Sequence, residues 1–132
     1  MKWYKMLLNP QALERLYDDV PALRGVELYS VHLKRDGPTL GLILDLPRFP
    51  DHPSARWPPE SNAIQVSLSF YTIRNARMVG WSSRMLADIN FDCSTNQMRV
   101  GIVGIDAELD LSFDCESFSI DRISAYINNA KH

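Results

Sequence analysis

The chain has 132 residues, of which 45% are hydrophobic and 23% are charged, and its formal net charge is −2 at pH 7. This length fits one domain over residues 1–132, with enough apolar side chains for a core that needs no disulfide or metal. No stretch is long and apolar enough to cross a membrane, and the run Met6–Leu8 is too short for a secretion signal. We therefore expect a cytoplasmic protein with no membrane partner.

The first predicted elements are a short helix and a β-hairpin. Asn9-Pro10 is typical of a helix start, because a capping side chain precedes proline at the first helical position. Residues 26–35 and 40–46 are strand-like, and the second segment alternates leucine with other side chains. They flank the turn sequence Asp36-Gly37-Pro38, so they are expected to pair antiparallel.

A proline-rich loop follows, from Pro47 to Pro59. Its five prolines prevent regular strand pairing and stiffen the backbone. The loop carries two large apolar side chains, Phe49 and Trp57. Because a loop this long is usually functional or folded back over the core, Trp57 either covers the core or contacts a partner, and we favour the first.

The rest of the chain is predicted to be mainly β-structure. Strand patterns recur at residues 64–70, 77–81, 87–93, 98–102 and 109–115, with turns expected at Asn75-Ala76 and at Ser94–Asn96. Residues 118–127 fit either a strand or a short helix. We therefore predict an α+β fold, which is a predominantly antiparallel β-sheet of about eight strands with a short N-terminal helix.

Two of these strands have an acidic side. Between Met85 and Asp121 the sequence has eight acidic residues and one base, Arg99. Because successive side chains of a strand leave opposite faces, one face is expected to be apolar and buried, with Ile89, Phe91, Leu111 and Phe113. The other face is expected to be exposed and to carry the candidate partner-binding residues Asp88, Asn90, Asp92, Asp110 and Asp114.

An acidic face of this kind attracts a basic partner and disfavours nucleic acid. The alternative interpretation is a solvated sheet face that the charges keep soluble. Opposite charges on neighbouring strands also pair, and Arg99 is the base expected to pair on this face.

The two cysteines are expected to be buried free thiols. In a simple three-strand meander, Cys93 and Cys115 end alternate strands at the same edge and on the same face. Two strand spacings amount to roughly 9–10 Å. A disulfide needs Cα atoms within about 7 Å, so this arrangement excludes one.

Catalytic motifs are lacking in the sequence, which contains no nucleophile elbow, P-loop or dinucleotide fingerprint. His32, His52 and His132 do not have metal-ligand spacing, so neither a metal nor another cofactor is expected. Asp110 and Asp114, four positions apart on one strand, would lie ~13 Å apart. That separation is too large for a two-carboxylate mechanism, and an enzyme is disfavoured.

Taken together, the order of the motifs resembles the immunity protein 50 family, predicted immunity proteins of bacterial polymorphic toxin systems. The residues that carry the resemblance are Asn9-Pro10, RDGPTLGLILDLPRFP at 35–50, Arg56-Trp57, Gly80-Trp81 and DRISAYI at 121–127. The resemblance covers nearly the whole chain and includes no catalytic motif.

It implies a binding protein that neutralises a cognate toxin, and it leaves the toxin and the oligomeric state open. A second hypothesis is a small-ligand or carbohydrate-binding β domain that uses Phe49, Trp57 and Trp81 as a stacking surface.

Overall fold

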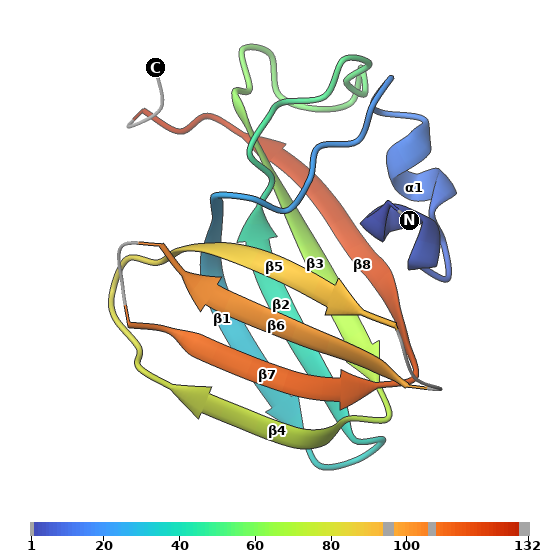
Figure 1. Cartoon of the computed structure of the whole chain (residues 1–132). Helices are drawn as coiled ribbons and strands as arrows, with labels where there is room; N and C mark the ends of the chain where they lie inside the picture. The colour runs from blue at the N-terminus through green and yellow to red at the C-terminus, as the bar shows by residue number, and fades with distance from the viewer. Residues whose placement is uncertain (1, 94–96, 106–107, 130–132) are drawn as a thin grey trace.

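The computed structural model describes residues 2–93, 97–105 and 108–129 (Figure 1). A 3-10 helix, η1 (Trp3–Met6), and a one-turn helix, α1 (Gln11–Glu14), precede the strands. The described residues form the strands β1 (Val26–Lys34), β2 (Thr39–Asp45), β3 (Ala63–Tyr71), β4 (Arg74–Val79), β5 (Leu86–Asp92), β6 (Met98–Gly104), β7 (Asp110–Cys115) and β8 (Ser117–Tyr126). The predicted α+β fold is confirmed, while the turn expected at Ser94–Asn96 lies outside the described residues.

All eight strands belong to one antiparallel sheet with the order β4-β7-β6-β5-β1-β2-β3-β8. The predicted hairpin of β1 and β2 and the meander of β5, β6 and β7 are both present. β3 and β4 follow each other in the chain but lie far apart in the sheet, since β4 pairs with β7 at one edge.

The sheet bends between β1 and β5, which pair only over Val26–Ala87 and Glu27–Leu86. We call β4, β7, β6 and β5 the front half and β1, β2, β3 and β8 the back half. In Figure 1 the front strands cross the back strands obliquely. The core lies between the two halves, where Phe70 of β3 packs edge to face against Phe113 of β7 with ring centroids 5.0 Å apart.

The expected register of β5 and β7 is confirmed, because Ile89, Leu111 and Phe113 are buried. Phe91 differs from the expectation, since it is only partly buried. Its ring stacks with Trp3 of η1 at 6.3 Å and with Phe118 of β8 at 5.2 Å. Phe91 lies where the two halves open, and the N-terminal segment covers it in part.

The expected helix start at Asn9-Pro10 is only partly correct. Helix α1 begins at Gln11 after Pro10, but no side chain caps it. The Asn9 side chain instead exchanges two hydrogen bonds with the backbone of Ile120 in β8. The side-chain amide can both donate and accept, so it pairs with the N–H and the carbonyl of a single residue on this strand edge.

Three further segments can be compared with the predicted elements. Residues 117–126 form a strand and not a helix. Asn75 does not lie in the expected turn before β4 but within β4 itself. It has a positive φ of 55° and lies beside an irregularity in the pairing with β7. Trp81 lies beyond the end of β4, because Gly80 turns the chain at a φ of 77°.

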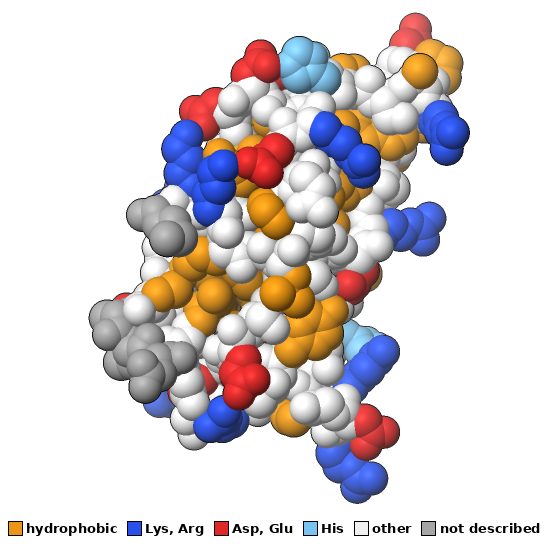
Figure 2. Space-filling model, turned by 90° about the vertical axis from the view of Figure 1, so that its right-hand side faces the viewer, with side chains coloured by type: hydrophobic (Ala, Val, Ile, Leu, Met, Phe, Trp, Pro, Cys, Tyr) orange, Lys and Arg blue, Asp and Glu red, His pale blue; other side chains and the backbone are white. Residues whose placement is uncertain are grey.

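Figure 2 shows the side of the molecule on which the N-terminal elements lie. Hydrophobic side chains gather near the middle of this side, and Lys and Arg side chains lie around them. Leu8, whose backbone N–H bonds the Phe118 carbonyl, has 63% of its surface exposed.

Candidate functional site

The predicted partner-binding residues all lie on the outer side of the front half, which we call the front outer face. Cross-strand register arranges this face in three rows. The first row is Asp88, Val103, Asp110 and Val79, the second is Asn90, Gly101, Ser112 and Arg77, and the third is Asp92, Arg99, Asp114 and Arg74. The face is therefore a patterned surface in which acids meet bases and apolar side chains.

The third row pairs its acids with bases. Arg99 lies opposite both Asp92 and Asp114, and its Nη1 donates to the Asp114 carboxylate at 2.7 Å. Asn75 donates to the same carboxylate at 2.8 Å. These two hydrogen bonds, with Asn75 the larger cause, hold the pKa of Asp114 below its usual range. The Asp114 side chain lies on the outer side as expected, but it is only 14% exposed because these partners cover much of it.

The second row carries a further base at its β5 end. Arg24, which precedes β1, donates from Nη1 to the side-chain oxygen of Asn90 at 2.7 Å. Arg77 occupies the β4 end of the same row, opposite Ser112. Asn90 is exposed, but its amide oxygen is already engaged by Arg24.

The first row alone contains no base. Asp110 is exposed, and within the described residues its carboxylate has no hydrogen bond or ion pair. Asp88 is partly exposed and accepts a hydrogen bond from the Gly25 backbone N–H at 2.9 Å. Uncompensated negative charge is therefore concentrated at the end of the front outer face where β7 begins.

Exposed apolar side chains lie at this same end, which sequence patterns did not reveal. Val79 and Val103 flank Asp110 in the first row. Trp81 lies two residues after Val79, and Ile105 lies two residues after Val103. About half of each of these side chains is exposed, Trp81 at 51%. An apolar residue at an outward position is the signal that could have identified Val79 and Val103.

Phe49 and Trp57, the secondary candidate surface, pack on each other with ring centroids 6.0 Å apart. Both are partly buried against the core, as expected for a Trp57 that covers it. Trp57 lines two hollows, one of about 370 Å³ shared with Phe49 and one of about 470 Å³ shared with His52. Trp81 lines neither hollow, so the three aromatic residues do not form one stacking surface.

Several contacts fasten the proline-rich loop to the segment after α1. Tyr17 donates its hydroxyl to the Arg48 carbonyl at 2.5 Å, and burial raises the pKa of this phenol. The His52 ring lies 2.6 Å from the Asp18 carboxylate, whose hydrogen bond raises the pKa of the imidazole. The loop is therefore held in place and does not hang free above the sheet.

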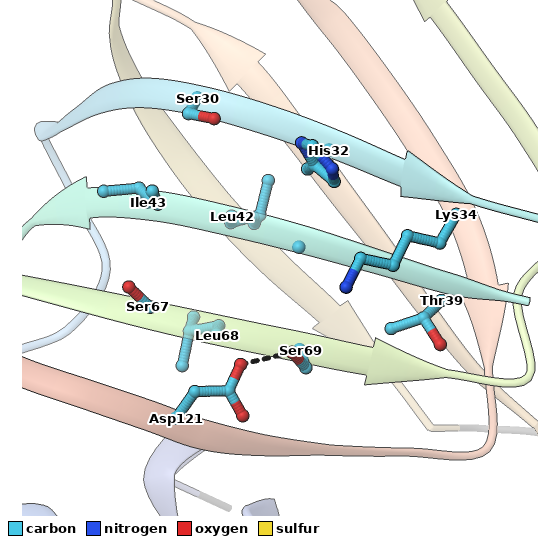
Figure 3. A pocket seen from close by; sticks show the side chains of 11 residues that line it. Ser30, His32, Lys34, Thr39, Leu42, Ile43, Ser67, Leu68, Ser69 and Asp121 are labelled. Atoms are coloured by element: carbon cyan, nitrogen blue, oxygen red, sulfur yellow. Dashed lines mark hydrogen bonds between the residues drawn. The ribbon is translucent and has the colours of Figure 1, made fainter. Parts of the chain in front are cut away.

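A shallow hollow of about 210 Å³ lies on the outer side of the back half (Figure 3). Small side chains such as Ser67 and Ser69 create it, and the Lys34 side chain reaches over β2. Ser69 donates its hydroxyl to Asp121, while His32 lies on β1, two strands from Ser69. The serine and the carboxylate bond each other directly, so this arrangement is not a Ser-His-Asp triad.

Asp45 is a buried carboxylate at the end of β2, with only 3% of the residue exposed. It accepts hydrogen bonds from the hydroxyls of Tyr29, at 3.2 Å, and Tyr126. Burial raises the pKa of both phenols, which keeps them protonated as donors. This cluster ties β1, β2 and β8 together and thus satisfies a buried charge within the fold.

The cysteines are both free thiols, as predicted. Cys115 is buried, but Cys93 is exposed, which contradicts the expectation for that residue. β5 ends at Asp92, so Cys93 lies beyond the strand pattern that would have turned it inward. Its sulfur lies 3.3 Å from that of Met6.

Within the described ranges, no three His, Cys, Asp or Glu side chains gather closely enough to hold a metal ion. None of the helices in these ranges has the length and hydropathy needed to cross a bilayer.

The model of one protein family, described as immunity protein 50, matches residues 9–126 of the chain. The match spans α1, all eight strands and the proline-rich loop. Neither the curated proteins nor the solved structures include a significant match.

Proposed function

Because the chain belongs to the immunity protein 50 family, and is thus an immunity protein of a toxin system, we propose that it binds and neutralises a cognate toxin domain through its front outer face. The family match over residues 9–126 supports neutralisation by binding, since the members of this family are generally not catalysts. The cognate toxin is the partner, and its activity is blocked while the complex lasts.

The charge pattern supports the choice of face. Toxin domains that act on nucleic acid need a basic surface to hold phosphates, and a carboxylate patch competes for that surface. Asp110 and Asp88 are carboxylates of the front outer face that no base in their row compensates. They attract a basic domain over a distance and orient it before contact.

The experiment requires a toxin domain, and the gene next to this chain's gene is the place to seek it. A large secreted protein with a variable C-terminal domain is expected to be encoded there. That C-terminal domain is produced in a bacterial host with and without this chain, and the growth of the host cells is measured. In parallel the two purified proteins are mixed in a titration calorimeter.

We expect the domain alone to stop growth, and co-production of the chain to restore it. The calorimeter should show a complex with a defined stoichiometry and an affinity at least in the range of stable protein pairs. A domain that stops growth equally in the presence of the chain, and that does not bind it in the calorimeter, would refute the proposed function.

A further inference from the structure

Four apolar side chains, Val79, Trp81, Val103 and Ile105, lie exposed where β4 and β6 end. We call this set the apolar corner. Val103 and Val79 flank Asp110 on the front outer face. Ile105 is tied to the start of β5, because its N–H donates to the Leu86 carbonyl at 2.8 Å.

Gly80 places Trp81 at this corner. The glycine backbone lies so close to Glu108 that a Cβ added to Gly80 would be 2.2 Å from the Glu108 carbonyl oxygen. Its φ of 77° is also one that other residues rarely adopt. The chain thus packs closely against the segment that leads into β7. The Trp81 side chain is therefore exposed near the acidic row and does not turn into the core.

The corner combines two features that mark the centre of a protein interface. Exposed tryptophan and aliphatic side chains provide apolar area, and tryptophan is the residue most often found among those that dominate binding energy. Asp88 and Asp110 lie in the same row as Val103, and the exposed Glu108 belongs to the segment packed on Gly80, so the area carries negative charge. Arg77 lies two residues before Val79, in the second row, and Arg84 comes three residues after Trp81, so bases border the negative patch along the chain.

We propose that the apolar corner is the anchor of the toxin interface, and that Trp81 inserts into an apolar recess of the toxin domain that Lys or Arg side chains surround. This rests on the proposed function and goes further, because it assigns the centre of the interface to specific residues. The acidic row guides the basic domain in, and the apolar corner then determines how long it stays.

A second copy of this chain is the less favourable occupant. Two identical corners brought face to face would bring Asp110 and Asp88 of one copy near those of the other. Like charges in contact oppose such a pair, whereas a basic domain neutralises them. Leu8, a strongly exposed leucine between η1 and α1, is the other candidate anchor, and a variant there serves as the matched control.

The test compares Trp81→Ala with Leu8→Ala in titrations with the toxin domain encoded beside this chain's gene. Both changes remove an exposed apolar side chain, so both variants should unfold at the temperature of the wild type. We expect Trp81→Ala to raise the Kd at least ~30-fold, mainly through faster dissociation, and Leu8→Ala to change it less than about threefold.

The pattern of results separates the two proposals. If the wild-type chain binds the domain and Trp81→Ala binds equally well, the anchor is refuted while the proposed function stands. If Leu8→Ala alone weakens binding, the anchor lies on the N-terminal segment and the inference is likewise wrong. If the wild-type chain sediments as a dimer that Trp81→Ala converts to a monomer, a second copy occupies the corner and the inference is overturned.

Discussion

Asn9 and Ile120 lie 111 positions apart in the chain and exchange two hydrogen bonds. The Asn9 Nδ2 donates to the Ile120 carbonyl at 2.8 Å, and the Ile120 N–H donates to the Asn9 Oδ1 at 3.0 Å. A side-chain amide thus continues the ladder of the edge strand β8. This contact holds the N-terminal segment over the place where the two halves of the sheet open.

Replacing Asn9 by Ala should therefore destabilise the protein. Both hydrogen bonds are partly buried, and their loss leaves a backbone donor and acceptor of Ile120 unpaired. We expect the free energy of unfolding in urea to fall by about 1–3 kcal/mol. The exposed neighbour Gln11→Ala is the control and should change it by less than about 0.5 kcal/mol. Equal effects of the two substitutions would show that the contact contributes nothing.

The centre of the core gives a second prediction. Phe113 is fully buried and joins the front half to Phe70 of the back half. Phe113→Ala should lower the free energy of unfolding by about 3–5 kcal/mol, because the cavity left by the ring is only partly refilled. Val103→Ala on the adjacent strand exposes no core and should cost less than about 1 kcal/mol. Urea unfolding of both variants measures these two losses. A larger loss for Val103→Ala than for Phe113→Ala would contradict the register.

The thiols should differ in reactivity. Cys93 is exposed, whereas burial raises the pKa of Cys115 to about 12 and thereby disfavours its reactive thiolate. An Ellman titration of the native, unreduced protein should find one fast thiol, and unfolded protein should show two. Cys93→Ser should abolish the native reaction. A fast thiol that persists in this variant would place Cys115 at the surface.

The pKa of His52 should depend on Asp18. The carboxylate accepts a hydrogen bond from the imidazole and raises its pKa above the ordinary 6.5. The pair therefore favours the folded state below pH 6.5, and this contribution disappears as the pH rises through the raised pKa. In an NMR titration, Asp18→Asn should lower the His52 pKa, and the neighbouring change Asp19→Asn should leave it in place. An unchanged His52 pKa in Asp18→Asn would remove this pair from the loop's anchoring contacts.

Alternation in the sequence predicted which side chains face inward but not which strands pair. The leucines of β2 and the apolar positions of β7 follow a period of two, which determines the buried face. The period contains no information on partners, so it did not reveal that β4 joins β7 while β3 joins β8. Strand order depends on long-range packing, such as the contact of Phe70 with Phe113.

The same limit applies to the candidate surface. The sequence identified Asp110 and Asp114 as equivalent acids on one face. The cross-strand register separates them, because Asp114 lies opposite Arg99 and Asp110 lies opposite Val103. The sequence groups Trp81 only with the other aromatic residues, because its exposure depends on how Gly80 packs against Glu108.

Association kinetics with the cognate toxin domain test the central claim most directly. Asp110→Lys reverses an exposed charge on the front outer face, in the row without a base, and Asp36→Lys reverses an exposed charge in the turn after β1. At an ionic strength of roughly 0.01 M, Asp110→Lys should slow association several-fold more than Asp36→Lys, and at about 1 M the two rates should converge, because salt then screens charges beyond about 3 Å. Equal association rates for both variants at low salt would contradict binding through this face.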